Sequence, residues 1–306
     1  MRTIAEFDDV LFIIQDHNWI RPYLKDICPH IANPYIGNRL FPRILRELWF
    51  RFNMPGKSIW YNKEISTEYS IIVLFDSLII PDYLKWLRRL CAQSRIILVY
   101  ANKVANTINP EKISDGLCEQ WSSDYADCTR YNLNFASGGG YIRLPLKENK
   151  RCLQNDVLFV GRDKNRAHTL FTYKKKLEDI GLSTFFYLVA PRRFLNFRNR
   201  FYKPLIPYDD ILELIHQSKA ILHLVEGGQI GATMRVMESL FHQKKLITDN
   251  QLISNCEFYN RNNIFILGKD ELGELPEFIN KPYIPIKEDI LEKYYFDNFI
   301  KNIIGN

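Results

Sequence analysis

Residues 222–248 read LHLVEGGQIGATMRVMESLFHQKKLIT, and the pattern changes twice along this stretch. An apolar run ends before the adjacent glycines Gly227 and Gly228, and a third glycine follows at position 231. Apolar residues then recur at helical spacing, at positions 234, 237, 240 and 241, before a second short apolar run. The stretch therefore predicts a strand, a glycine loop, a helix and another strand.

A helix that begins directly after a glycine loop favours anion binding. Its first backbone N–H groups have no partners within the helix, and its dipole is positive at this end, which suits a phosphate or diphosphate. Arg235 and Glu238 are three residues apart and share a face in the first turns. Arg235 offers charge to a phosphate, and Glu238 can accept hydrogen bonds from sugar or ribose hydroxyls. Tight packing alone is the alternative explanation for the glycines.

Short apolar runs alternate with amphipathic segments through the whole chain. Strands are predicted at 9–14, 69–76, 95–100 and 119–124, and again at 156–161, 184–189 and 264–267. Helices are predicted between them, including one that begins near Pro81, one at 43–52 with a basic outer face and one at 207–218. Apolar strands that alternate with helices are typical of a parallel sheet covered on both faces. The fold class is predicted to be α/β with doubly wound sheets.

The length of 306 residues suits two domains of about 150 residues each. The best junction lies between the three glycines at 138–140 and the charged segment at 147–151. We interpret these glycines as a linker, because no strand and helix flank them as a phosphate loop requires. We therefore expect an N-terminal domain over residues 1–148 and a C-terminal domain over 149–306. The final helix, at about 289–304, is expected to pack back on the N-terminal domain.

Composition and charge restrict the class of protein. The formal net charge of +6 suits an anionic ligand or an anionic membrane surface, but it is small for a nucleic-acid-binding protein. We therefore predict no nucleic-acid partner. The six cysteines lie far apart without a C-x-x-C pair, which favours reduced thiols over a zinc site or disulfides. The N-terminus is acidic and no apolar run approaches about 20 residues, so we expect a cytoplasmic protein.

Residues 192–203 interleave cations with aromatic side chains. Three hypotheses fit this composition: a solvated loop, a lid over a cleft, or a contact with anionic lipid headgroups. The third would place the protein peripherally on the inner face of the cytoplasmic membrane. A nucleic-acid contact at the same segment would predict binding that is sensitive to salt.

The second half of the chain resembles the group 1-like donor-binding domain of GT-B glycosyltransferases, particularly the bacterial enzymes of lipopolysaccharide-core and capsule assembly. The likeness rests on VGRDKNR at 160–166, on residues 208–218, and on Gln229-x-Gly231-x-Thr233-x-Arg235-x-x-Glu238 followed by KKLIT. Looser likeness in the first half rests on FDS at 75–77, YAN at 100–102 and WSSD at 121–124. The resemblance implies two Rossmann-like domains that face each other across a cleft, with a nucleotide-diphosphate sugar bound mainly to the second.

The resemblance also implies which residues bind the donor. Glu238 matches the family's glutamate that contacts the ribose hydroxyls, and the backbone at 231–233 would hold the diphosphate together with Arg235. The full predicted donor set comprises Gly161, Arg162, Lys164, Arg166, Gln229, Gly231, Thr233, Arg235 and Glu238. Retaining members of the family carry two glutamates separated by seven residues. Ile230 stands where the first would be, so the retaining or inverting course is left open.

Glycosyl transfer needs positive charge near the leaving diphosphate and, for inversion, a base for the acceptor hydroxyl. Cations and helix ends can supply the charge, and no Asp-x-Asp motif follows a strand, so we predict no cofactor and no metal requirement. Asp76 is the predicted base, because the carboxyl end of a strand in a doubly wound sheet faces the ligand; a buried structural aspartate is the alternative. Asn102 and Asp124 occupy similar strand ends, and His223 is predicted to be a packed core residue.

The predicted function is transfer of a hexosyl or deoxyhexosyl group from a nucleotide-diphosphate sugar to a cell-surface glycan acceptor. The acceptor would be a glycolipid or oligosaccharide of lipopolysaccharide core, capsule or O-antigen assembly. A nucleotide-sugar-binding homologue without transfer activity, acting as a regulator or scaffold, is the first alternative. A basic nucleic-acid-binding protein is the second.

Overall fold

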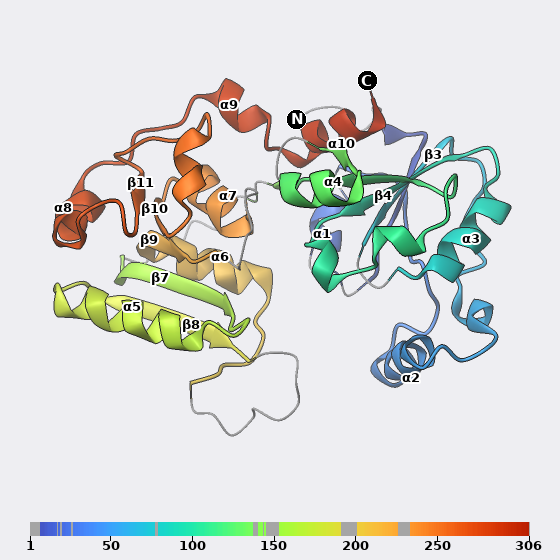
Figure 1. Ribbon diagram of the computed structural model, residues 1–306, viewed down its shortest axis with the longest axis horizontal. Coiled ribbons are helices and arrows are strands. Elements are labelled where there is room, and N and C mark those ends of the chain that lie inside the picture. The colour runs from blue at the N-terminus through green and yellow to red at the C-terminus, as the bar shows by residue number, and fades with distance from the viewer. Residues whose placement is uncertain are drawn as a thin grey trace. The chain divides into compact units, whose positions relative to one another are not determined.

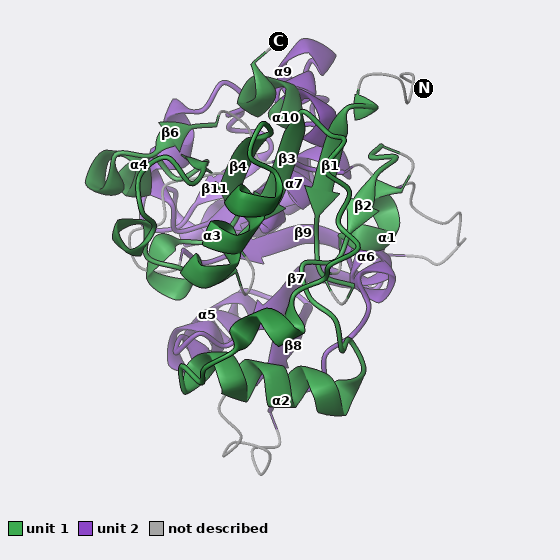
Figure 2. Ribbon diagram, turned by 90° about the vertical axis from the view of Figure 1, so that its right-hand side faces the viewer, with its two compact units in different colours: residues 1–137, 299–306 green, residues 138–298 purple. Residues whose placement is uncertain are grey.

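The computed structural model describes residues 7–16, 18, 20–25, 27–76, 79–136, 140–142, 144, 153–190, 201–225 and 233–305. The chain forms two compact units, residues 1–137 with 299–306, and residues 138–298 (Figure 2). Each unit is built on its own parallel sheet with helices packed against it (Figure 1). The predicted domain boundary between residues 148 and 149 lies outside the described residues, as does the charged segment at 147–151.

The first unit holds a six-stranded parallel sheet in the order β2-β1-β3-β4-β5-β6. Its strands are β1 (Val10–Ile13), β2 (Ile31–Ala32), β3 (Ile71–Phe75), β4 (Arg95–Tyr100), β5 (Glu119–Ser122) and β6 (Asn134–Phe135). Its α-helices are α1 (Arg21–Leu24), α2 (Leu40–Arg51), α3 (Pro81–Leu90) and α4 (Tyr125–Tyr131), with 3₁₀ turns η2 (Lys57–Trp60), η3 (Val104–Asn106) and η4 (Pro110–Lys112).

The apolar alternation of the central strands builds the core of this unit. Leu74 and Leu98 are paired in register on β3 and β4, and both are fully buried. Helix α3 begins with Pro81, a residue compatible with a first helical turn, and buries Tyr83, Leu84 and Leu87 in the same cluster. The strands and the helix predicted for this part of the chain are thereby confirmed.

Helix α2 contradicts one prediction, that of a basic outer face at 43–52. Its buried side chain is Arg46, which is 1% exposed, whereas Leu40, Phe41 and Leu48 are exposed. The reason is local: Arg46 donates a hydrogen bond of 2.7 Å to the carbonyl of Ile36 and its guanidinium lies over the ring of Tyr35. The apolar face of the helix consequently points to solvent.

The tail predicted as one helical segment forms two helices, α9 (Glu288–Glu292) and α10 (Phe296–Ile304). The break follows from backbone pairing, because Tyr141 N–H donates to the carbonyl of Tyr294 at 2.8 Å and Phe296 N–H donates to the carbonyl of Tyr141 at 3.0 Å. Residues 299–306 cluster with the first unit. There Arg95, held by Glu119 at 2.6 Å, donates to the carbonyls of the last turn of α10.

The second unit holds a five-stranded parallel sheet in the order β11-β10-β9-β7-β8. Its strands are β7 (Asn155–Arg162), β8 (Thr184–Val189), β9 (Ser218–His223), β10 (Lys245–Thr248) and β11 (Ile264–Ile266). Its helices are α5 (Ala167–Asp179), α6 (Tyr208–His216), α7 (Met234–Phe241), α8 (Leu275–Asn280) and α9, with 3₁₀ turns η6 (Gln251–Asn255) and η7 (Leu272–Glu274).

Successive residues of this sheet enter two different cores, because side chains alternate between the faces of a strand. Ile247 packs in a cluster with Leu170 and Leu177 of α5 and with residues of α8. Its neighbour Leu246 packs in another cluster with residues of α7 and with Leu291 of α9. The sheet is therefore covered on both faces, as predicted for a doubly wound unit.

Both sheets reverse their strand order at an equivalent place. In the first unit the chain passes from β1 to β2 on one side and continues with β3 on the other. In the second unit it passes from β7 to β8 and then crosses to β9. Ligands of open α/β sheets bind at such switch points, outside the carboxyl ends of the strands. The predicted α/β, doubly wound fold class is confirmed. In the second unit, the switch point lies between the adjacent strands β7 and β9.

Candidate functional site

The loop after β7 joins the ends of the two strands beside it. Arg162 donates a hydrogen bond of 3.4 Å to the carbonyl of Ala190, just beyond β8, and Arg166 donates to the carbonyl of Leu224, just beyond β9. The guanidinium of Arg166 also lies 5.3 Å from the ring centre of Phe159. Two of the predicted donor-binding cations thus organise the switch point of the second unit, and their side chains are only partly exposed.

The conformation of this loop is set by Asp163, which is buried. Its Oδ1 accepts a hydrogen bond of 2.9 Å from Arg166 N–H, and its Oδ2 accepts one of 2.6 Å from the hydroxyl of Tyr202. Between these anchors Lys164 and Asn165 take φ values of +50° and +65°, and both are exposed. The loop therefore presents the Lys164 side chain at the carboxyl edge of the sheet. Gly161 lies within β7, where a Cβ would make ordinary contacts with Phe159 and Arg166.

His223 connects the end of β9 to the start of α7. It is 5% exposed, its Nδ1 lies 2.9 Å from Oγ1 of Thr248, and its Nε2 lies 3.1 Å from Oγ1 of Thr233. Burial, reinforced by the charges of Arg166 and Arg235, lowers the pKa of His223 to about 4. The imidazole is therefore neutral near pH 7, and the prediction of a packed residue is confirmed.

Thr233 is the first described residue after the glycine loop and stands at the N-cap position of α7. Gln229 and Gly231, two members of the predicted donor set, lie outside the described residues, as do Glu226 and Ile230. The helix beyond Thr233 is almost wholly buried from Val236 to Phe241. Its N-terminal turn is thereby fixed in place at the carboxyl edge, close to the end of β9.

Glu238 has no exposed surface. Its Oε1 accepts a hydrogen bond of 3.1 Å from the hydroxyl of Tyr208, and its Oε2 forms an ion pair with Arg235, whose side chain is 19% exposed. Burial raises the pKa of Glu238 to about 7, although Arg235 and the Tyr208 hydroxyl act in the opposite direction. Glu238 and Arg235 do share a face, as the spacing predicted, and of the two it is Arg235 that reaches the surface.

A chain of buried polar groups continues behind Glu238. The hydroxyl of Tyr208 lies 3.2 Å from that of Tyr141, which in turn lies 2.7 Å from Nε2 of His242. Desolvation and the neighbouring Glu238 carboxylate raise the pKa of Tyr208. This network positions Glu238, and through it Arg235.

The sequence did not indicate Tyr141, Tyr208 or Asp249 as members of the site. Asp249 follows β10 and its Oδ1 accepts a hydrogen bond of 2.7 Å from Val225 N–H, which ties the residue after Leu224 to the end of β10. A polar residue after a predicted strand was a usable signal for Asp249. Tyr208 begins the 208–218 segment of the resemblance, but nothing in it pointed to a contact with Glu238. Tyr141 gave no signal, since its partners are distant in sequence.

In the first unit, Asp76 and Asn102 meet at the carboxyl ends of β3 and β4. Asn102 Nδ2 lies 3.3 Å from Asp76 Oδ2, and Ala101 N–H donates to Asp76 Oδ1 at 3.4 Å. Asp76 is 2% exposed, and burial raises its pKa to about 6. It follows β3, which adjoins β1 at the switch point of this unit.

Asp124, the third predicted strand-end residue, does not join this pair. Its Oδ1 accepts hydrogen bonds from Ala126 N–H at 3.0 Å and Asp127 N–H at 3.3 Å, which caps the start of α4. Its buried Oδ2 has no hydrogen-bond partner among the described residues.

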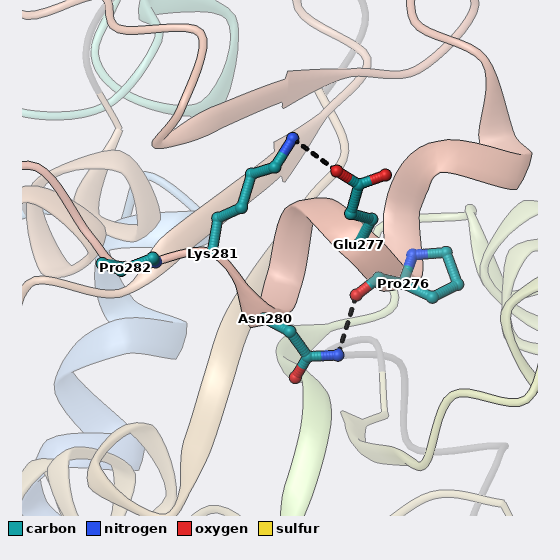
Figure 3. A pocket seen from close by; sticks show the side chains of 5 residues that line it. All are labelled: Pro276, Glu277, Asn280, Lys281 and Pro282. Atoms are coloured by element: carbon teal, nitrogen blue, oxygen red, sulfur yellow. Dashed lines mark hydrogen bonds and ion pairs between the residues drawn. The ribbon is translucent and has the colours of Figure 1, made fainter.

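A shallow pocket lies elsewhere on the second unit, lined by Pro276, Glu277, Asn280, Lys281 and Pro282 (Figure 3). Lys219, at the amino-terminal end of β9, donates to Asn280 Oδ1 at 2.9 Å. Lys245, at the same end of β10, donates to the carbonyl of Pro282 at 3.1 Å. The pocket therefore adjoins the amino edge of the sheet, opposite the edge that carries Arg166 and Thr233.

Three further findings concern the described residues alone. No group of three or more His, Cys, Asp or Glu side chains within them is arranged to hold a metal ion. Five cysteines are free: Cys28, Cys91, Cys118, Cys128 and Cys256. In the part of the chain that is described, no helix combines the length and apolarity needed to cross a bilayer.

No protein-family model matches the sequence, and no curated protein matches it. Among solved structures, the fold is similar to that of HepE from Anabaena in complex with UDP and glucose, with a TM-score of 0.54 and 11% identity over 97% of this chain and 98% of that chain. Lower scores relate it to a protein provisionally assigned as a UDP-N-acetylglucosamine 2-epimerase from Listeria monocytogenes (TM-score 0.41, 12% identity, 96% and 85% of the two chains). The glycotransferase of kitacinnamycin scores 0.40, with 9% identity over 92% and 84%.

At 11% identity, the likeness to HepE shows the fold. The chain has a GT-B-like architecture of two α/β units, with parallel sheets of six and five strands.

Proposed function

We propose that this protein is a glycosyltransferase that uses a nucleotide-diphosphate sugar. The observation that supports it best is the arrangement at the carboxyl edge of the second sheet, where Arg166, Arg235 and the N-terminus of α7 meet at the switch point of a GT-B-like unit. The similar HepE structure holds UDP and glucose.

The chemistry of this edge suits a diphosphate leaving group. The first N–H groups of α7 and the positive end of its dipole attract anionic oxygens. Negative charge collects on the diphosphate as its bond to the sugar breaks. The positive charges of Arg235 and Lys164 therefore stabilise the transition state more than the bound donor. In this proposal, Gly161, Arg162 and Arg166 shape the wall beside Thr233. Gln229 and Gly231 are retained as donor-binding residues on the sequence motif alone. No metal is required in this proposal.

A ribose hydroxyl can bind Glu238 only by replacing one of the protein groups that already contact its carboxylate. Both of its carboxylate oxygens already have protein partners, Tyr208 and Arg235. A ribose hydroxyl would therefore take the place of Arg235 on Oε2, and the released guanidinium would turn to the diphosphate. Donor binding and movement of Arg235 are then one event.

We propose Asp76 as the base that accepts the proton of the acceptor hydroxyl. A pKa raised to about 6 leaves most of this carboxylate ionised near pH 7 while keeping it basic enough to take a proton. Asn102 would orient it through their contact at 3.3 Å. The acceptor proposed is a glycolipid or oligosaccharide of a cell-surface glycan. Whether the course is inverting follows from whether Asp76 acts in this way.

The test is a panel of nucleotide sugars, measured by thermal shift and by release of the free nucleotide. A ligand that binds the folded state alone raises the melting temperature with its occupancy. Arg235→Ala should remove the response to the matching donor, and Arg261→Ala, an exposed cation elsewhere on the second unit, should leave it intact. Stabilisation without any nucleotide release across a set of acceptors would favour the homologue that binds but does not transfer.

A further inference from the structure

Helix α2 exposes the face that a helix of a globular protein normally buries. Leu40, Phe41 and Phe52 are 68%, 77% and 68% exposed, and Ile44, Leu45 and Leu48 between them are exposed as well. Figure 1 shows α2 set apart from the strands of the first unit. Apolar side chains scattered singly on a surface are ordinary, but a contiguous apolar face of this kind marks a contact with something else.

The orientation of α2 is fixed by its polar side. Arg46 is buried, bonded to the carbonyl of Ile36 and packed 5.1 Å over the ring of Tyr35. Tyr35 also packs edge-on against Phe50 at 5.1 Å. Rotating the helix to hide its apolar face would break this hydrogen bond and expose Phe50, so the outward apolar face is part of the stable fold.

The apolar surface extends beyond the helix. Ile36 precedes α2, and Met54 and Ile59 follow it, the last within η2; all three are exposed. Trp49 and Trp60 pack with ring centres 6.2 Å apart, and Trp49 Nε1 donates to the carbonyl of Pro55 at 2.9 Å. We call residues 36–60 the α2 surface.

The charge of the α2 surface is strongly one-sided. Residues 36–60 contain five cations, Arg39, Arg43, Arg46, Arg51 and Lys57, against one acid, Glu47. Arg46 is buried and Lys57 forms an ion pair of 2.5 Å with Asp82 of α3, so these two add little to the exposed charge. Glu47 lies 3.5 Å from Arg43 and offsets part of its charge. Arg39 and Arg51 flank the two ends of the helix and are both exposed. An apolar face with a cationic rim is complementary to a surface of acyl chains beneath anionic headgroups.

We propose that the α2 surface docks the protein on an anionic lipid bilayer, with α2 lying in the interface and its apolar side chains among the upper acyl chains. A second copy of the chain fits less well. A two-fold dimer brings the same patch together from both subunits, which would set each cationic rim against its equivalent. This proposal assigns a membrane contact to a different segment from the basic–aromatic residues 192–203.

Lipid docking is a property beyond the proposed glycosyl transfer. It can be tested separately, because vesicle binding requires neither donor nor acceptor. If both hold, docking would place the first unit beside acceptors that are anchored in lipid. A failure of vesicle binding would leave the nucleotide-sugar responses untouched, so the two outcomes can be told apart.

The experiment is co-sedimentation of the full chain with phosphatidylcholine vesicles, with and without phosphatidylglycerol. Binding to the phosphatidylglycerol vesicles is expected, with weakening as salt is added. The double variant Phe41→Ser, Phe52→Ser should lose about a hundredfold in partition, since each ring contributes apolar area worth roughly tenfold or more. The matched control is Phe201→Ser, Leu205→Ser, which alters two exposed apolar residues of the second unit and should bind normally.

The charge contribution needs its own pair of variants. Arg39→Glu, Arg51→Glu should abolish the preference for phosphatidylglycerol, and Arg261→Glu, Lys269→Glu, two exposed cations of the second unit, should retain it. Because all these side chains are exposed, unchanged circular dichroism and melting temperature are expected throughout. Equal binding by the α2 variants would overturn the proposal. So would a dimer, seen by light scattering, that the Phe41→Ser, Phe52→Ser variant dissociates.

Discussion

The hydroxyl of Tyr208 donates a hydrogen bond of 3.1 Å to Oε1 of Glu238, a carboxylate that has no exposed surface. Tyr208 begins α6 and Glu238 lies in α7, so this bond joins the two helices that flank β9 in the sequence. The other carboxylate oxygen is bound to Arg235. The one partly exposed cation in this group is therefore held by a buried acid whose own position depends on Tyr208.

The first prediction removes that hydroxyl. Tyr208→Phe should lower the free energy of unfolding by about 1–3 kcal/mol, because it leaves a buried carboxylate oxygen without its donor. It should also raise the pKa of Glu238 further, since the Tyr208 hydrogen bond lowers it. Urea denaturation at pH 7 measures the first effect. Tyr187→Phe is the control: its hydroxyl donates to the carbonyl of Pro204 in an exposed position, and a comparable loss there would contradict the special role of Tyr208.

The second prediction concerns pH and Glu238→Gln. Burial raises the pKa of Glu238 from 4.5 to about 7, so the folded protein binds a proton more tightly than the unfolded chain between these values. This contribution to stability is complete below about pH 4.5 and is lost as the pH rises through about 7. The free energy of unfolding of the wild-type protein, measured relative to Glu238→Gln, should therefore fall by up to about 3 kcal/mol between pH 4.5 and pH 8.

Glutamine suits this comparison because its carbonyl can accept from Arg235 while its amide donates to the Tyr208 oxygen. Urea denaturation of both proteins across the pH range gives the difference directly. A gap between the two proteins that stays constant with pH would mean that Glu238 titrates normally in the fold.

The sequence was sufficient to predict the central strands of both sheets, but not the two-residue edge strands β2 and β6. The apolar runs of β3, β4, β7 and β9 are unbroken, because a strand buried on both faces has no polar side to interrupt it. Arg166 and Arg235, which the family resemblance assigned to one site, both lie close enough to His223 for their charges to lower its pKa.

Pairs that are distant in sequence could not be predicted. Tyr141 meets Tyr208 and His242 across 67 and 101 residues, and no local pattern encodes such partners. The burial of Glu238 depends on the same contacts. The predicted orientation of helix α2 was wrong for another reason. Periodicity shows that apolar residues share a face of the helix, but not that this face is buried. The burial of Arg46 against Tyr35 decided its orientation.

The third prediction separates two cations of the β7 loop. Lys164 is exposed and has a φ of +50°, a left-handed conformation that asparagine tolerates. Lys164→Asn should weaken donor binding by roughly fivefold, the scale of one exposed charge contact, with little change in melting temperature. Arg166→Ala should weaken it too, and should also lower the free energy of unfolding by about 1–3 kcal/mol. The fold is destabilised because the substitution removes the hydrogen bond to the Leu224 carbonyl and the cation–π contact with Phe159.

Thermal shift with the matching nucleotide sugar and urea denaturation without it measure the two effects separately. Lys269→Asn, on an exposed turn of the same unit, is the control for charge. Unaltered donor affinity in both loop variants would remove the β7 loop from the proposed site.

The fourth prediction tests Asp76 as the base. Burial raises the pKa of Asp76 from 3.8 to about 6, so its stabilising contribution is complete below about pH 3.8 and lost as the pH rises through about 6. Above that pH, Asp76→Asn should be more stable than the wild-type protein by up to about 3 kcal/mol. Its amide oxygen can still accept from Asn102 and from Ala101 N–H, so the strand ends stay in place.

As the base, Asp76 would make the transfer rate rise with pH through about 6, and its replacement by asparagine would lower that rate by roughly 10²–10⁴-fold. Donor binding should persist, because Asp76 belongs to the first unit and the proposed donor residues to the second. Stability curves at pH 5 and pH 8, donor binding and transfer rate together decide between the two hypotheses for this residue. A more stable variant that transfers at the wild-type rate would make Asp76 a structural aspartate, and the proton acceptor would then have to be sought elsewhere.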